Sequence, residues 1–142
     1  MLRPFQKDKN REKKTAELTA VGRAFGHEDP DLVIRNPDYL AQKFLSMPWK
    51  IAKTPLFRKL VMKLYEKKLP GQYIFAQVRT LFFDEILQQE LEQGIEQLVI
   101  LGAGFDSRAH RFEQALKNVK VFEVDSVVEN GFIAPGNLID IF

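Results

Sequence analysis

The chain has 142 residues, 45% of them hydrophobic, so it is long enough for one domain with a core and too short for two independent ones. Its charged content of 28% and net charge of +2 exclude a disordered chain and a protein that coats nucleic acid. The absence of cysteine excludes disulfides, thiolate metal sites and a cysteine nucleophile, and we expect no metal site and a reducing, cytoplasmic location.

No stretch of the sequence approaches the roughly 20 apolar residues of a membrane-spanning helix. The basic N-terminus has no apolar segment behind it that would form the core of a signal peptide. We therefore expect a protein that is neither inserted in a membrane nor secreted.

The first predicted element is a helix that follows a polar arm. Residues 1–14 carry charges of both signs, which predicts a flexible solvated arm rather than a nucleic-acid tail. From Thr15, apolar residues recur at helical spacing, and Gly26 stands where a left-handed residue would end the helix. The apolar positions of this helix are Leu18, Val21 and Phe25.

Two helices that start at prolines are predicted next. Asn36 and Pro37 provide an N-cap and a first-turn proline for a short helix that runs through Phe44 and is closed by Pro48. Thr54 and Pro55 open a third helix, whose remaining surface is basic. That basic face fits an ordinary surface helix, with a membrane surface or an acidic partner as the alternative. The positions predicted to face inward are Leu56, Leu60 and Leu64.

A change of period then marks the start of a sheet. The longest predicted helix covers residues 72–93 and ends at Gly94. Residues 98–101 form a continuous apolar run, which predicts a strand of a parallel sheet that is buried on both faces. A crossover helix over 108–117 and a second strand over 119–124 complete a strand-helix-strand unit. Residues 126–142 show no convincing pattern.

Two glycines and an acid form the candidate binding site. Gly102 and Gly104 lie between the first strand and the crossover helix, where a side chain would keep a ligand away from the backbone. Asp125 follows the second strand, and its carboxylate can accept both hydroxyls of a ribose. This arrangement predicts a nucleoside cofactor.

The residues after the loop favour S-adenosylmethionine over NAD. A dinucleotide loop would place a third glycine at position 107, which is serine, and Asp106 would repel a pyrophosphate. A cationic sulfonium tolerates this acid, although Asp106 could equally serve as an N-cap of the crossover helix.

These residues resemble the leucine carboxyl methyltransferase family, including its large bacterial branch. Residues 97–111 resemble the first motif of that family, and residues 121–125 resemble its acidic second motif. Residues 15–24 and 79–84 are similar to the helical segments that precede its sheet. The apolar Ile100 departs from the acid common in methyltransferase first motifs, and the residues after Asp125 do not look like the continuation of the family.

The resemblance implies a fold and a cofactor site. The implied fold is α/β, an incomplete Rossmann-like sheet of a class I methyltransferase that follows an N-terminal helical cap. We expect a polar arm over 1–14, the cap over 15–94 and the start of the cofactor-binding part over 95–142. The resemblance places Gly102 and Gly104 under S-adenosylmethionine, Asp125 at its ribose and Arg79 at its methionine carboxylate. Arg23 is a weaker candidate for that last position.

The expected activity is O-methylation of a carboxylate or similar acceptor on a small molecule or peptide. A carboxylate is already an anion, so this reaction needs no general base, and neither His27 nor His110 is assigned a catalytic role. The alternative is a truncated, inactive fragment that serves at most as a cofactor-binding or interaction module. Uncovered sheet edges would then favour self-association.

Overall fold

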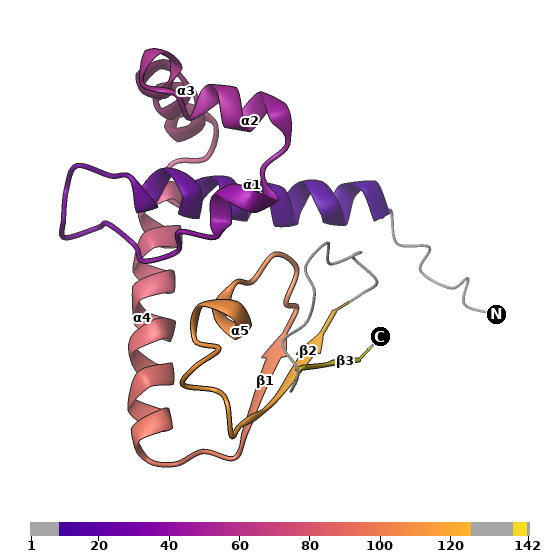
Figure 1. Cartoon of the computed structure of the whole chain (residues 1–142). Helices are drawn as coiled ribbons and strands as arrows, with labels where there is room; N and C mark the ends of the chain where they lie inside the picture. Colours follow the sequence, from indigo (N-terminus) through magenta and orange to yellow (C-terminus); the bar gives the residue numbers. More distant parts are fainter. Residues whose placement is uncertain (1–8, 126–137, 142) are drawn as a thin grey trace.

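The computed structural model describes residues 9–125 and 138–141 as a helical part packed against a small parallel sheet (Figure 1). The helices and strands, in chain order, are α1 (Lys9–His27), the 3₁₀-helix η1 (Ala41–Phe44), α2 (Met47–Ala52), α3 (Pro55–Lys68), α4 (Gln72–Glu92), β1 (Gln97–Leu101), α5 (Arg108–Arg111), β2 (Lys120–Val124) and β3 (Leu138–Ile141).

Helix α1 is longer than predicted, and Gly26 does not have the role that was predicted for it. It begins at Lys9 instead of Thr15, because the Lys, Arg and Glu residues at its start are good helix formers. Gly26 lies within the helix and has no left-handed backbone, which corrects the predicted C-cap. A Cβ at Gly26 would lie only 1.8 Å from Oε1 of Gln77, so this glycine permits the close approach of α4.

The core of the helical part lies where α1 crosses α4 (Figure 1). Its buried residues are Ala20, Val21, Ala24, Phe25, Ala41, Leu45 and Tyr73. Helix α4 contributes mainly polar side chains to its buried side, including Gln77, Thr80 and Asp84. Several of its apolar residues are exposed instead, among them Ile74, Val78 and Phe82.

The segment between α1 and α3 departs from prediction. The Asn36 side chain accepts a hydrogen bond from the Asp38 backbone amide at 2.8 Å, and this local turn replaces the predicted helix start. Of the helix predicted here, only Ala41–Phe44 is helical, and Pro48 lies in the first turn of the next helix, α2, rather than closing a helix.

Helix α3 begins at Pro55 as predicted, but its buried side was predicted wrongly. Leu56, Leu60 and Leu64 are 81%, 58% and 49% exposed. The helix instead packs against the core through Val61, Met62 and Tyr65, which lie on another side.

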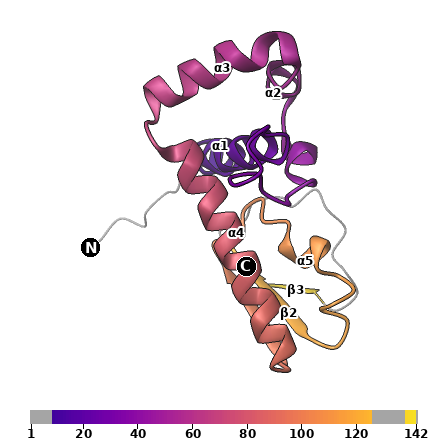
Figure 2. The same cartoon turned by 90° about the vertical axis from the view of Figure 1, so that its left-hand side faces the viewer.

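The sheet has the order β1-β2-β3, and both pairs of strands are parallel. The third strand was not predicted, and residues 126–137 before it lie outside the described residues. One face of the sheet packs on α4 and the 108–119 segment (Figure 2). Val99 and Leu101 on the other face of β1 are 52% and 75% exposed, so the prediction that this strand is buried on both faces is wrong.

The crossover between β1 and β2 contains less helix than predicted. Helix α5 covers only Arg108–Arg111, and residues 112–118 continue as turns that include a 2.9 Å bond from the Leu116 amide to the Phe112 carbonyl. These turns still bury Leu116 and Val119 against α4, which is the packing that a longer helix would have provided.

Within the described residues, no helix has both the length and the apolar character needed to cross a bilayer. The same residues contain no cluster of His, Asp and Glu side chains that could hold a metal ion.

Candidate cofactor-binding site

The glycine loop begins directly after β1, at the carboxyl end of the sheet. Gly102 and Gly104 have φ angles of +63° and +53°, in the region that residues with a side chain rarely adopt. The Gly102 amide donates to the Val124 carbonyl at 2.7 Å, which anchors the loop to β2. A Cβ at Gly102 would meet no atom within 4 Å, so the side-chain position of this residue faces open space.

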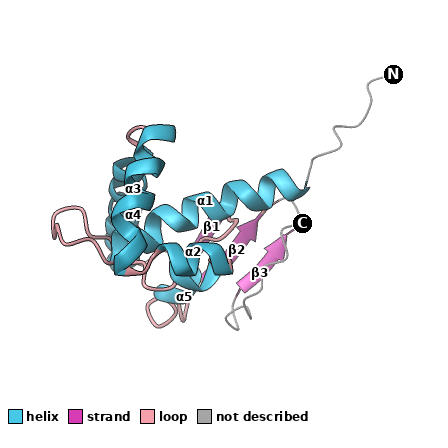
Figure 3. Cartoon of the chain, turned by 90° about the horizontal axis from the view of Figure 1, so that it is seen from above, coloured by secondary structure: helices cyan, strands magenta, loops and turns pink. Residues whose placement is uncertain are grey.

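Asp125 follows β2 and lies against the same loop. Its Oδ2 accepts a hydrogen bond from the Gly104 amide. Helix α1 lies close to the other side of the loop, because a Cβ at Gly104 would be 3.4 Å from Cβ of Ala16. Seen from above, α1 therefore lies beside the carboxyl ends of β1 and β2 (Figure 3).

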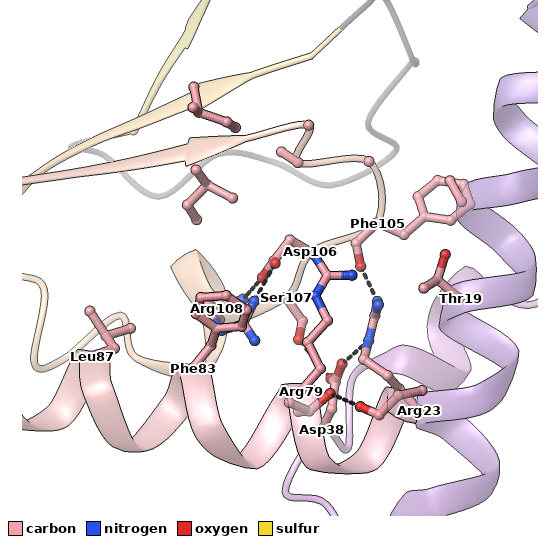
Figure 4. A pocket seen from close by; sticks show the side chains of 18 of the residues that line it. Thr19, Arg23, Asp38, Arg79, Phe83, Leu87, Phe105, Asp106, Ser107 and Arg108 are labelled. Atoms are coloured by element: carbon pink, nitrogen blue, oxygen red, sulfur yellow. Dashed lines mark hydrogen bonds and ion pairs between the residues drawn. The ribbon is translucent and has the colours of Figure 1, made fainter. Parts of the chain in front are cut away.

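An open pocket of about 1290 Å³ lies between α1, α4, β1 and the glycine loop (Figure 4). Arg79, Gly102, Gly104 and Asp125, the predicted cofactor residues, all line it, and so does Arg23. The volume exceeds the roughly 300–1,000 Å³ of typical small-molecule sites. The pocket therefore has room for more than one small ligand.

Arg79 differs from the other arginines of the pocket. It extends from α4 toward the glycine loop, with its guanidinium 5.8 Å from the centre of the Phe83 ring (Figure 4). Among the described residues, no carboxylate forms an ion pair with it, whereas Arg23, Arg108 and Arg111 each pair with buried aspartates. Arg79 is therefore the pocket arginine best placed to bind an incoming anion.

A buried charge network, which sequence reasoning missed, joins the helical part to the loop. Nε of Arg23 donates to Oδ2 of Asp38 at 2.7 Å, and its second terminal nitrogen donates to the Phe105 carbonyl. Nε of Arg111 donates to the Ser107 hydroxyl at 2.9 Å, and that hydroxyl donates to Asp38. Asp38 follows Asn36 and Pro37, which predicted only a helix start, and no local signal in the sequence indicated that Asp38 would be buried.

Asp84 is the second buried acid of this network. It accepts hydrogen bonds from Arg108 at 3.0 Å and from Arg111 at 2.5 and 2.8 Å, which fixes α5 on α4. Burial alone would lower the pKa of the Arg111 guanidinium, but its bonds and charge attraction to Asp84 outweigh this effect and raise that pKa. The Arg111 side chain therefore stays charged while buried.

Asp106 takes part in the start of α5. Its Oδ1 accepts a bond from the Arg108 amide at 2.9 Å, and its Oδ2 pairs with the Arg108 guanidinium at 2.5 Å. The residue also lines the pocket, so this structural role leaves it near any ligand of the loop.

The two histidines, His27 and His110, are not among the residues that line the pocket. Nδ1 of His27 lies 3.1 Å from the Asn36 carbonyl, and burial lowers the pKa of His110.

The residues of the pocket fit S-adenosylmethionine. The empty side of Gly102 would let a ligand lie against the loop backbone, and a carboxylate such as Asp125 can accept ribose hydroxyls. Arg79 offers a planar cation for the methionine carboxylate, and Asp106 provides negative charge that a sulfonium tolerates.

A parallel sheet whose first loop carries glycines, with an acid after the next strand, is the arrangement of α/β proteins that bind nucleoside cofactors. The family model of leucine carboxyl methyltransferases matches residues 16–128. The chain belongs to this family, as the resemblance of its first motif predicted.

Individual relatives agree with this assignment. A Streptomyces avermitilis protein is 44% identical over 57 residues, which are 40% of this chain and 20% of that protein. Proteins of Mycobacterium tuberculosis and Mycolicibacterium vanbaalenii are both 30% identical over 128 residues, covering 78% of this chain and 36% and 37% of their own lengths. All carry the name "Putative S-adenosyl-L-methionine-dependent methyltransferase". The chain thus spans about a third or less of the length of these curated relatives.

Proposed function

We propose that this chain carries the S-adenosylmethionine site of a methyltransferase that transfers a methyl group to a carboxylate oxygen of a small molecule or peptide. The observation that carries the proposal is the meeting of Arg79, the glycine loop and Asp125 around one pocket. Family membership and the names of the relatives support the cofactor.

In this proposal, Asp125 binds the ribose hydroxyls and Arg79 binds the methionine carboxylate through a bidentate charge-assisted contact. Gly102 and Gly104 allow the nucleoside to lie against the backbone at the carboxyl end of β1. S-adenosylmethionine, when bound, supplies an electrophilic methyl group. The residues of the pocket then need only to orient the acceptor carboxylate, and such positioning contributes up to about 7–11 kcal/mol.

The test is calorimetric titration of the full 142-residue chain with S-adenosylmethionine, with NAD as the competing cofactor. We expect saturable binding of S-adenosylmethionine and none of NAD. Asp125→Ala and Arg79→Gln should each weaken binding about tenfold or more, because each removes hydrogen bonds to or from a charged group.

The matched control is Lys63→Gln on α3, which removes one positive charge at an exposed position outside the pocket. The Lys63→Gln variant should bind S-adenosylmethionine as tightly as the unchanged chain does, because a distant surface charge contributes little to binding at ordinary ionic strength. A folded chain that binds no S-adenosylmethionine would refute the proposed site. The chain would then be an inactive member of its family and at most an interaction module.

A further inference from the structure

We infer that Asp38 is a positioning residue that holds the glycine loop in the shape that binds the cofactor. The inference rests on the proposed function and deepens it. Asp38 lies 69 residues before Ser107 in the sequence, in the turn between α1 and η1, and its side chain is 1% exposed. It reaches the loop through two separate connections.

The first connection runs through the Ser107 hydroxyl at the end of the loop. That hydroxyl donates to Oδ1 of Asp38 at 2.7 Å and accepts from Nε of Arg111 at 2.9 Å. Both hydrogen-bonding directions of the hydroxyl are therefore in use, and Ser107 itself is buried. Asp38 consequently fixes the residue at which the loop enters α5.

The second connection runs through Arg23 to the middle of the loop. Oδ2 of Asp38 accepts from Nε of Arg23 at 2.7 Å, which aims that guanidinium at the Phe105 carbonyl (Figure 4). The Phe105 ring also stacks on Phe44 of η1, with ring centres 5.0 Å apart. The loop is therefore held to the helical part beside Gly104, the glycine whose amide meets Asp125.

Both oxygens of Asp38 are needed for these contacts. Oδ1 also accepts from the Ala41 amide at 3.0 Å, and Oδ2 accepts from Arg23. An amide group replaces one of these two oxygens by nitrogen. Whichever oxygen is replaced, at least one donor then loses its acceptor. Asp38→Asn keeps the size of the side chain but leaves only one acceptor oxygen. It should release one of the two connections without opening a cavity.

The experiment compares Asp38→Asn with Asp29→Asn, the same change at another buried aspartate of the helical part. Asp29 accepts bonds from the Tyr73 hydroxyl and the Asp31 amide and does not line the pocket. Backbone amide exchange is measured by NMR, in particular at Asp106, whose amide donates to the Ala103 carbonyl at 2.8 Å. Affinity for S-adenosylmethionine and the melting temperature are measured on the same samples.

We expect Asp38→Asn to accelerate exchange in the loop and to weaken S-adenosylmethionine about tenfold, the factor that corresponds to one charge-assisted hydrogen bond. Asp29→Asn should lower the melting temperature but leave loop exchange and affinity unchanged. If Asp38→Asn does not fold, Ser107→Ala removes the first connection alone and should change both measurements in the same direction.

Unchanged loop exchange in a folded Asp38→Asn variant would overturn the inference. Faster loop exchange with unchanged affinity would also overturn it, because the loop shape would then not matter to the cofactor. An unchanged chain that binds no S-adenosylmethionine would instead refute the proposed function. In that case the exchange comparison would still decide whether Asp38 positions the loop.

Discussion

Gly102 is important for two reasons, the backbone conformation of the loop and the access of a ligand to it. Its left-handed φ makes any side chain costly by about 1–2 kcal/mol, and the residue lines the pocket with open space at its side-chain position. We predict that Gly102→Ala destabilises the protein by this amount and also weakens S-adenosylmethionine binding. Urea unfolding and calorimetric titration measure the two effects separately.

Gly94 provides the matched control for this prediction. Its φ is +80°, no atom lies within 4 Å of its would-be Cβ, and it does not line the pocket. Gly94→Ala should therefore cost similar stability and leave the affinity unchanged. Equal affinities of the two variants would mean that no ligand lies against the backbone at Gly102.

At the scale of elements, the contact between α1 and α4 depends on a glycine and a buried amide. The Gln77 side chain donates to the Gly22 carbonyl at 3.0 Å and accepts from Asn36, and it occupies the space beside Gly26. Alanine at Gly26 would gain about 1 kcal/mol of helix propensity. The clash with Gln77 is larger, so we predict a net destabilisation of about 1–3 kcal/mol, measured by urea unfolding.

Two comparisons test the cause of that loss. Gly22→Ala, in the same helix, meets Cβ of Ala76 at 3.2 Å and should cost less than Gly26→Ala. The double variant Gly26→Ala/Gln77→Ala should lose less stability than the sum of the two single changes, because the clash is gone. Strict additivity would contradict the packing explanation.

Sequence reasoning identified elements where the signal is local and failed where partners are distant. Pro55 at the start of α3 and the left-handed Gly94 after α4 follow from short-range backbone preferences, and both are present. Leu60 repeats at helical spacing like a core residue, yet it is 58% exposed, because spacing alone does not show which side has a partner. The four-residue strand β3 is too short to give a period.

The residues of the candidate site also fall into two groups, those that the sequence predicted and those that it did not. Gly102, Gly104 and Asp125 belong to one strand-loop-strand unit, so the order of residues along the chain is enough to place them together. Asp38 and Asp84 acquire their roles from arginines in other elements, and a charged residue in a sequence is by default a surface residue. Their burial could not be predicted without the fold. The division of the chain at residues 14 and 94 stays a prediction.

At the scale of the whole molecule, the open side of the sheet has a consequence for assembly. Among the described residues, no strand pairs with the outer edge of β1. Val99 and Leu101 are exposed on the same strand, where they also line the pocket. We predict that a second copy of the chain covers this edge in solution. Sedimentation velocity should show a concentration-dependent species larger than the monomer, and Val99→Lys should reduce it.

Leu56→Lys on α3 is the control, since Leu56 is 81% exposed but lies on another element. It should leave the distribution of species unchanged. Dissociation by Leu56→Lys and not by Val99→Lys would place the association on α3, and a monomer at all concentrations would exclude it.

The connections of Asp38 and Arg23 to the glycine loop also set an order of events during synthesis. Ser107 and Phe105 leave the ribosome 69 and 82 residues after the partners that hold them. Until then, the Asp38 carboxylate can be bound only by the Ala41 amide, the Arg23 guanidinium and water, and its burial beneath the loop has to wait. The helical part can collapse early, whereas the loop acquires its final shape only through contacts of long sequence separation, which form slowly. The binding site therefore matures after the helical part.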